Sequence, residues 1–210
     1  MDYLSFIANS IHTVVAATAD NNGLPVTCAI DIMDADENGL YFLTAKGKEF
    51  YSRLKNRGYI SLTGIKGADI LSRVAVSVRG KVKEIGNGPL KSLFEKNPYM
   101  NEIYPTENSQ IALTVFKIYN GKGEYFDLSK KPIERFLFEF GNDKIRSTGY
   151  NMCYTITAAC TDCRVCEAVC PQNCIDFTLT PATIHKEHCL HCGNCMEVCP
   201  HRAVVLEEYR

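Results

Sequence analysis

Tryptophan is absent from these 210 residues, and neither sign of charge is in excess: 23 Lys and Arg stand against 24 Asp and Glu. A near-neutral chain gives no support for binding to nucleic acid or to an anionic membrane, because both need a strong basic excess. No apolar run approaches the roughly 20 residues of a membrane span. The start, Met1–Leu4, lacks a basic region ahead of an apolar one and predicts no secretory signal. We therefore expect a cytoplasmic protein with no nucleic-acid or membrane partner.

Cysteine, by contrast, is abundant and unevenly placed. Of the eleven cysteines, Cys28 stands alone and ten fall between Cys153 and Cys199. Clustered cysteines in a cytosolic chain are more often metal ligands than a disulfide framework. The polar turn sequence Gly141–Lys144 separates the two regions. The sequence thus predicts a front domain over 1–140, a linker over 141–150 and a second domain over 151–210.

The front domain has the pattern of an antiparallel β-barrel. Turn signals at Asn21–Gly23 and Asp36–Gly39 separate short runs rich in β-branched and aromatic residues. Many short strands joined by turns favour closure into a barrel, so we expect a mainly β domain. The expected strands are 11–17, 26–33, 40–44, 59–63, 73–85, 111–119, 124–128 and 132–140, with helices over 2–9, 47–57 and 89–95.

The second domain contains an internal repeat. The run Cys160–Pro171 recurs as Cys189–Pro200, with every cysteine offset by 29 residues. The residues that follow also match, since Ile175–Phe177 aligns with Val204–Leu206. Each copy is therefore expected to form a ligand loop, one helical turn and a short strand.

Each copy reads C-x2-C-x2-C-x3-C-P, the run of bacterial ferredoxins that binds iron–sulfur clusters. Cysteines two residues apart in a tight loop let successive thiolates converge on one cubane, whereas the fourth faces the neighbouring cluster. The region resembles a two-cluster bacterial ferredoxin domain, a small α+β fold with two [4Fe–4S] clusters. The predicted ligands are Cys160, Cys163, Cys166 and Cys199 for cluster one, and Cys189, Cys192, Cys195 and Cys170 for cluster two.

Other uses of these cysteines fit less well. Zinc sites also use C-x2-C pairs but need four ligands from two separated pairs, and disulfides give no reason for a repeat of 29 residues. Cys174 aligns with Ala203, so a small buried side chain is expected there. Cys153 is expected to be structural, with a redox thiol as the alternative. The tail histidines are expected in solvated loops rather than as ligands: His185, His188, His191 and His201.

One stretch of the front domain has the chemistry of a phosphate site. The strand 40–44 ends in Thr44 and continues as Ala45-Lys46-Gly47-Lys48 ahead of a helix. A hydroxyl, two lysines and a helix N-terminus suit a phosphate, although Lys-Gly-Lys turns are common before helices. No G-x-G-x-x-G motif or P-loop occurs. His12, the only histidine here, is expected to be an ordinary strand residue.

The order of elements resembles the pyridoxamine 5'-phosphate oxidase-like FMN-binding split barrels over about residues 1–140. The matching segments are 23–30, 39–44, 48–56, 78–82 and a closing hairpin over 115–127. The resemblance implies FMN bound across a homodimer interface, with its phosphate at Thr44 and Lys48 and with Lys46 as a further candidate. It places the flavin ring and ribityl chain along Thr27, Cys28, Ala29 and Ile30.

The chain departs from the oxidase proper at several positions. Glu49 and Phe50 stand where the oxidase has an Arg-Lys pair, and Arg57-Gly58 replaces the usual Asn-Pro. The basic residues that bind the pyridoxal substrate have no match. The resemblance therefore carries over the flavin fold but not pyridoxamine oxidation.

An FMN barrel joined to a two-cluster ferredoxin predicts an oxidoreductase. The clusters would exchange electrons with a redox partner protein or a small-molecule donor or acceptor, and FMN would reduce or oxidise a small organic substrate. No residue pattern identifies the substrate, the direction of electron flow or the proton donor. Two alternatives stay open: a non-catalytic electron carrier or redox sensor, and a barrel that binds haem or nothing while the ferredoxin domain docks a partner.

Overall fold

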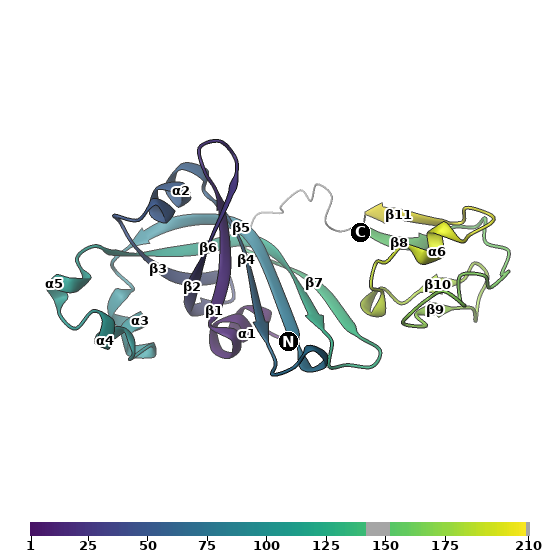
Figure 1. Cartoon of the computed structure of the whole chain (residues 1–210), viewed down its shortest axis with the longest axis horizontal. Coiled ribbons are helices and arrows are strands. Elements are labelled where there is room, and N and C mark those ends of the chain that lie inside the picture. The colour runs from purple at the N-terminus through teal and green to yellow at the C-terminus, as the bar shows by residue number, and fades with distance from the viewer. Residues whose placement is uncertain (142–151, 209–210) are drawn as a thin grey trace. The chain divides into compact units, whose positions relative to one another are not determined.

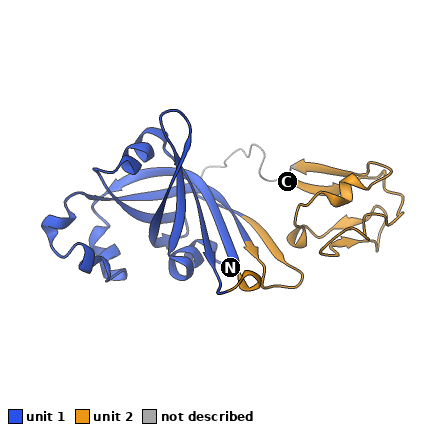
Figure 2. Ribbon diagram, viewed as in Figure 1, with its two compact units in different colours: residues 1–68, 74–125, 138–145 blue, residues 69–73, 126–137, 146–210 orange. Residues whose placement is uncertain are grey.

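A computed structural model of the chain describes residues 1–141 and 152–208. The chain divides into two compact units, coloured blue and orange in Figure 2. Unit 1 comprises residues 1–68, 74–125 and 138–145, and unit 2 comprises residues 69–73, 126–137 and 146–210. Apart from Gly141, the predicted linker 141–150 lies outside the described residues. None of the described helices has the length and apolar character that a membrane crossing requires.

Six strands close into a barrel, and a seventh extends its sheet (Figure 1). The order is β3-β2-β1-β4-β5-β6-β7, and the antiparallel pairing of β3 with β6 closes the circle. The mainly β front domain predicted from the sequence is confirmed. The strands are β1 (Thr13–Ala19), β2 (Pro25–Asp36), β3 (Gly39–Ala45), β4 (Tyr59–Lys66), β5 (Val74–Gly86), β6 (Leu113–Asp127) and β7 (Glu134–Phe140).

Strand alternation fills the barrel with apolar side chains. In β1, Val14 and Ala16 are buried whereas Val15 between them is exposed, as period-two side-chain geometry requires. Phe42 of β3 stacks on Phe116 of β6 with ring centroids 5.7 Å apart. Helix α2 (Glu49–Arg57) buries Phe50 and Leu54 against this core and ends at Gly58, whose left-handed backbone suits glycine.

Short helices lie before and between the barrel strands. The chain begins with α1 (Tyr3–Phe6), which runs into the π-helical turn η1 (Ile7–Ile11), and the 3₁₀ turn η2 (Ile70–Ser72) precedes β5. Helices α3 (Leu90–Lys96), α4 (Met100–Ile103) and α5 (Glu107–Gln110) lie between β5 and β6. Apolar residues of α3 and α4 pack against Met33, Leu113 and Val115, forming a second core on the outside of the barrel.

The predicted hairpin over 115–127 is wrong, because β6 runs unbroken through the apparent turn Asn120–Gly123. A Cβ at Gly121 would lie 2.6 Å from Phe140 Cζ, and one at Gly123 would lie 2.3 Å from Phe138 Cζ. These glycines therefore admit aromatic rings over a strand instead of forming a turn. The hairpin that does form joins β6 to β7.

The ferredoxin region of unit 2 has two small sheets. β8 (Met152–Ile156) pairs with β11 (Val204–Glu208), and β9 (Ile175–Asp176) pairs with β10 (Thr183–Ile184), all antiparallel. The second copy of the repeat has the predicted helical turn, α6 (Asn194–Glu197), preceded by the 3₁₀ turn η3 (Lys186–His188). The first copy has a non-helical turn over 165–169 at the equivalent place. The predicted small α+β domain is confirmed.

The backbone repeats as the sequence does. Residues with positive φ occur in three pairs, each offset by 29: Asp162 with His191, Arg164 with Gly193, and Asn173 with Arg202. One of these six residues is a glycine and three are Asn, Asp or His, which adopt positive φ comparatively often, whereas Arg164 and Arg202 rarely do. The loop shape that the two copies share is therefore set by the loop as a whole.

Candidate functional site

A cavity of about 430 Å³ opens on the barrel between β2, β3 and the helices that follow β5. It gathers five of the seven residues predicted to hold FMN. These are Cys28, Ala29, Ile30, Thr44 and Lys48. Thr27 and Lys46 are not in its lining: Thr27 is exposed on the outer face of β2, and Lys46 is exposed in the turn after β3.

The end of the cavity where the sequence predicts the phosphate contains a hydroxyl group without a hydrogen-bond partner. Thr44 is 4% exposed, and its Oγ1 is buried with no hydrogen-bond partner. Lys48 lines the same cavity and is the N-cap of α2, whose first turn has no side-chain cap. A buried hydroxyl without a partner is costly unless a ligand satisfies it. A phosphate supplies the acceptor oxygens that Thr44, Lys48 and the helix N-terminus lack, so these residues fit a phosphate-bearing cofactor.

Sequence reasoning missed Arg53, a second cation near strand β2. Burial raises the pKa of the Cys28 thiol, and the nearby charges of Arg53 and Lys48 offset part of that rise. The Arg53 guanidinium donates from Nε to Thr18 Oγ1 at 2.9 Å and lies 3.5 Å from the Glu49 carboxylate. It lies one helical turn after the position where the oxidase pattern expects a basic pair. Helical spacing from Glu49 was the signal available in the sequence.

The structure also corrects the expectation for His12. This residue precedes β1 and is not part of it, with φ 65° and ψ −68°. Its ring contacts Tyr99, and both lie beside Asp31, which lines the cavity. Because Tyr99 follows His12 by 87 residues, no local sequence pattern could have connected them.

The cysteine repeat brings its predicted ligands together. One cavity in the ferredoxin region is lined by Cys170, Cys189, Cys192 and Cys195, the set predicted for cluster two. Cys166 lies close enough to Cys160, Cys163 and Cys199 for their charges to raise its pKa, together with burial, which contributes most. These are the four residues predicted for cluster one. Within the described residues no three His, Cys, Asp or Glu side chains form a site for a single metal ion.

The electrostatics of this region suit a cationic metal cluster. Burial and the neighbouring thiolates of Cys189 and Cys192 raise the pKa of Cys195 to about 11. A hydrogen bond from the Cys174 thiol lowers the pKa of Cys189 to about 6. Thiolates that repel one another in a buried site need a compensating positive charge, which bound iron provides. The donor set therefore fits iron–sulfur clusters.

Backbone N–H groups support the fourth cysteine of each copy. The amide of Ala203 donates to Cys199 Sγ at 3.2 Å, and the amide of Cys174 donates to Cys170 Sγ at 3.4 Å. The same contact thus recurs at an offset of 29 residues. Ala203 and Cys174 are both buried, as their alignment predicts, and the Cys174 Sγ lies 3.5 Å from Cys170 Sγ. Cys153 is also buried, in β8.

Two of the four tail histidines are not simple solvated residues. Within unit 2, His188 Nδ1 donates to the carbonyl oxygen of Ile133 at 3.1 Å, and His191 Nε2 lies 2.6 Å from Arg135 Nη1. Both partners belong to the segment 126–137. His185 and His201 are exposed, as expected. Sequence analysis could not foresee the first two contacts, which join residues 55 and 56 positions apart.

The fold and these two sites define a split-barrel protein that carries a ferredoxin-type iron–sulfur domain. Residues 3–125 match the pyridoxamine 5'-phosphate oxidase family, and residues 159–203 match the 4Fe-4S dicluster domain. The family match spans more than half of the chain. The chain belongs to the pyridoxamine 5'-phosphate oxidase family, and its C-terminal part is a 4Fe-4S dicluster domain.

The similar proteins match either the barrel or the ferredoxin region. A Clostridium acetobutylicum protein related to general stress protein 26 of Bacillus subtilis, of the pyridoxinephosphate oxidase family, shares the barrel fold. Its TM-score is 0.51 at 18% identity, covering 63% of this chain and 89% of that one.

Two curated relatives match the ferredoxin part alone. They are a component of an ion-translocating oxidoreductase complex from Methanosarcina acetivorans, 40% identical over 47 residues, and the PorD component of pyruvate synthase from Methanothermobacter marburgensis, 40% identical over 48 residues. The matches cover 22% and 23% of this chain, and 18% and 56% of those relatives. The ferredoxin part is thus similar to parts of oxidoreductase complexes.

Proposed function

We propose that this protein is an FMN-dependent oxidoreductase that passes electrons between two [4Fe–4S] clusters and FMN, and so reduces or oxidises a small organic substrate. The proposal depends on one observation, that a single chain contains both kinds of site. The split barrel has a cavity whose residues fit a phosphate, and the ferredoxin region brings together two sets of four cysteines. The similarity of the ferredoxin part to components of oxidoreductases supports a role in electron transfer.

Different cavity residues would bind different parts of FMN. Thr44 Oγ1 would donate to a phosphate oxygen, and the Lys48 ammonium would neutralise part of the phosphate charge. The strand residues Cys28, Ala29 and Ile30 would flank the ring, with the Arg53 guanidinium near Cys28. A bound flavin exchanges electrons in pairs with organic substrates and singly with iron–sulfur clusters, which is why the two cofactors suit one chain.

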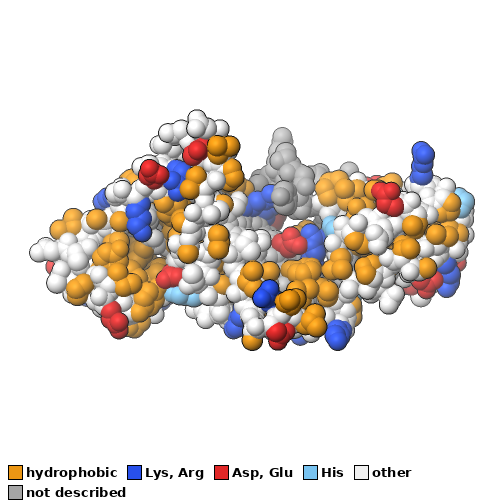
Figure 3. All heavy atoms as spheres, in the orientation of Figure 1, with side chains coloured by type: hydrophobic (Ala, Val, Ile, Leu, Met, Phe, Trp, Pro, Cys, Tyr) orange, Lys and Arg blue, Asp and Glu red, His pale blue; other side chains and the backbone are white. Residues whose placement is uncertain are grey.

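The partner needed to complete the barrel site is proposed to be a second copy. Ala29, Val15, Thr63 and Ser77 lie opposite one another on β2, β1, β4 and β5, so an uncharged row crosses the outer face of the sheet. Val15 is 56% exposed in this row, and Ala29 also lines the cavity. Much of the surface over β1 in Figure 3 is uncharged. Val15→Lys should yield monomers by light scattering and weaken FMN binding, whereas Leu24→Lys, at an exposed turn, should do neither.

The cofactor assignment is tested on anaerobically purified protein. Two cubanes predict about eight iron and about eight acid-labile sulfide per chain, with one FMN. Stoichiometric zinc without sulfide, or a haem spectrum without flavin, would contradict the assignment. Reduction of the clusters should then reduce the flavin at a rate independent of protein concentration. A rate proportional to concentration would mean that the two cofactors are tethered without forming one electron path.

The alternative of a non-catalytic carrier or redox sensor needs a separate experiment. An enzyme should turn over at least one organic acceptor or donor in an anaerobic steady-state screen, at a rate that depends on Lys48. A carrier or sensor would hold both cofactors and exchange electrons with proteins but turn over no small molecule.

A further inference from the structure

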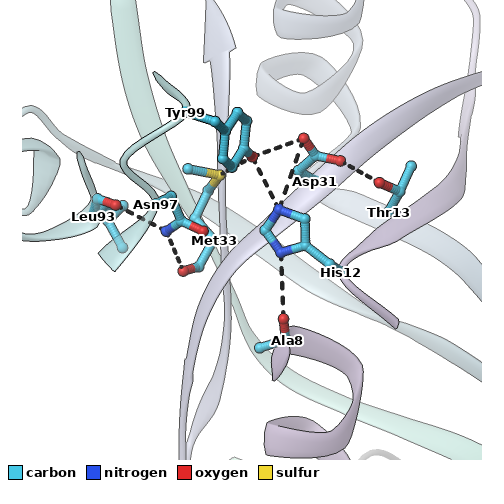
Figure 4. Close-up of polar contacts among 8 residues, drawn as sticks. All are labelled: Ala8, His12, Thr13, Asp31, Met33, Leu93, Asn97 and Tyr99. Carbon is cyan, nitrogen blue, oxygen red and sulfur yellow. Dashed lines mark hydrogen bonds and ion pairs between the residues drawn. The ribbon is translucent and has the colours of Figure 1, made fainter. Parts of the chain in front are cut away.

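A chain of three titratable side chains leads away from the barrel cavity (Figure 4). Tyr99 Oη donates to Asp31 Oδ2 at 2.8 Å, and His12 Nε2 lies 3.0 Å from Tyr99 Oη. Asp31 lines the cavity, and Tyr99 and His12 follow behind it. Asp31 lies in β2, Tyr99 lies in the turn before α4, and His12 lies directly ahead of β1.

Counting hydrogens shows that this chain holds a mobile proton. The carbonyl oxygen of Ala8 only accepts, so His12 Nδ1, 3.3 Å away, carries a hydrogen. One more hydrogen must lie between His12 Nε2 and Tyr99 Oη, and another between Tyr99 Oη and Asp31 Oδ2. Tyr99 supplies only one of these two. The other therefore belongs to His12 Nε2 or to Asp31 Oδ2, and moving it between them requires only that the tyrosine hydroxyl reverse its donor direction.

The backbone at His12 is held in an unusual conformation that aims the ring at Tyr99. Its φ of 65° is rare for a residue with a side chain. The His12 amide donates to the Ile7 carbonyl and the Ile32 amide donates to the His12 carbonyl, both at 2.8 Å. Backbone hydrogen bonds from both the amide and the carbonyl of His12 thus maintain a backbone conformation that costs free energy. Strained conformations of this kind are concentrated at functional sites.

The other two members are also fixed. Thr13 Oγ1 donates to Asp31 Oδ1 at 2.7 Å, which leaves Oδ2 directed at Tyr99. The buried Asn97 amide donates to the carbonyl oxygens of Leu93 and Met33, both at 2.8 Å, and ties the turn that carries Tyr99 to β2. Figure 4 shows these contacts around Asp31 and Tyr99.

The two ends of the chain reach different surroundings. The side chains of His12 and Asp31 are 32% and 34% exposed, but only Asp31 lines the cavity. A molecule bound in the cavity would cover Asp31 and leave His12 as the end that exchanges protons with water. Burial and the hydrogen bond to the Asp31 carboxylate raise the pKa of Tyr99, so this hydroxyl keeps a proton and transmits rather than stores charge. Among the contacts described for His12, Asp31 and Tyr99 are the titratable groups.

We propose that His12, Tyr99 and Asp31 form a proton relay from solvent to the barrel cavity, with Asp31 as the group that exchanges the proton with the reacting molecule. This inference rests on the proposed function and supplies the proton donor that the sequence does not identify. Tyr99 and His12 are positioning and relay residues, since they do not reach the cavity themselves.

The relay step balances in atoms and charge. His12 Nε2 gives its hydrogen to Tyr99 Oη while the hydroxyl hydrogen of Tyr99 passes to Asp31 Oδ2, so one proton moves and no electron does. Asp31 then gives that proton to the molecule reduced in the cavity, and the Tyr99 hydroxyl turns its hydrogen back toward the Asp31 carboxylate. His12 Nε2, which is then free of that hydrogen, takes a proton from solvent. When bound, the cofactors of the proposed function would supply the electrons. Oxidation of the substrate runs the same steps in reverse.

The test uses the full chain with its cofactors and the variants Tyr99→Phe and His12→Gln, neither of which alters a residue lining the cavity. The protein is reduced with dithionite, then mixed anaerobically with benzoquinone in weak buffer. Flavin absorbance and a pH indicator are followed together. Redox-induced infrared difference spectra, which need no turnover, report the protonated carboxyl of Asp31, identified by its loss in Asp31→Asn. Tyr41→Phe is the matched control, because its hydroxyl donates to Asp36 with no histidine beyond.

We expect Tyr99→Phe to slow proton exchange at least tenfold, since a positioned acid or base contributes about 10²–10⁴ in rate. The Asp31 carboxyl band should shift in Tyr99→Phe and stay unchanged in Tyr41→Phe. Imidazole in solution should restore the rate of His12→Gln but not of Tyr99→Phe. If both variants bind FMN normally and exchange protons at the wild-type rate, the relay is wrong while the flavin site stands. If the wild-type chain binds no FMN, the proposed function is wrong and the relay with it.

Discussion

The barrel and the ferredoxin region are stabilised in different ways. In the described residues, the main barrel core contains nineteen buried apolar side chains, whereas the ferredoxin core contains three, and two of those are Cys166 and Cys195. A core that small does not stabilise a fold by burial alone. The barrel can therefore build its site on a rigid scaffold, whereas in the ferredoxin region two of the predicted metal ligands are themselves part of the core.

The largest effect should come from removing the clusters. Iron chelation, or the pair Cys189→Ser and Cys160→Ser, should abolish amide protection over residues 152–208 and leave the barrel protected, because metal binding there is coupled to folding. Hydrogen exchange measured by mass spectrometry gives both readings in one experiment. Cys153→Ala, which removes a buried cysteine outside the ligand sets, is the control. Retained protection without iron would mean that the region folds by itself.

Next in size should be loss of phosphate affinity in the barrel. Lys48→Ala removes one charge from the proposed phosphate site, and a charge-assisted hydrogen bond contributes about 1.5–3 kcal/mol. FMN should therefore bind about ten- to a hundredfold more weakly by fluorescence titration. Riboflavin, which has no phosphate, should be indifferent to the change. Unaltered FMN affinity would move the phosphate site elsewhere, with Lys46 as the next candidate.

A barrel glycine should show how tightly that scaffold is packed. Gly121→Ala places a Cβ 2.6 Å from Phe140 Cζ and 2.7 Å from the Arg79 carbonyl oxygen, and backbone cannot yield cheaply. We expect a loss of about 1–3 kcal/mol in the free energy of unfolding, measured with denaturant. Gly88→Ala, which meets nothing within 4 Å, should cost little. Equal effects at the two positions would show that the close contact of β6 with β5 and β7 is absent.

The smallest effect concerns acid stability of the barrel. Burial acts to raise the pKa of the Asp36 carboxyl, but hydrogen bonds from Lys117 and Tyr41 hold this pKa below its usual range. A carboxyl with a lowered folded pKa adds stability above its unfolded value, near 4, and loses it as pH falls through the folded pKa. Lys117→Met should therefore flatten the fall in barrel stability below about pH 4. Denaturant unfolding at several pH values checks this, with Lys66→Met as a surface control.

The ferredoxin site was predictable because its ligands are spaced along the chain. Evenly repeated cysteines predict both the metal and the grouping of its ligands, and the structure brings the two predicted sets together. The barrel site depends on contacts between distant segments. Thr44 and Lys48 were found because a strand, a turn and a helix adjoin in sequence, whereas Tyr99 reaches the region only through packing.

The errors have the same physical origin. Asn120–Gly123 has turn chemistry, but the rings of Phe138 and Phe140 need glycine beneath them, so the segment stays extended. Local composition cannot distinguish a glycine required by backbone conformation from one required by a neighbour. Likewise His12 looked like a strand residue because the preceding π turn leaves no sequence pattern.

One consequence follows from the position of Cys170, which belongs to the first copy of the repeat and lies in the cavity of the second. The two copies have exchanged arms within a single chain, the internal counterpart of a swapped dimer. Each copy, cut out alone, would keep four cysteines, but only three of them belong to the same predicted cluster. Replacing the fourth cysteine of one copy should therefore remove a ligand from the cluster bound mainly by the other copy. Oxidative loss of one cluster should likewise weaken the binding of the other.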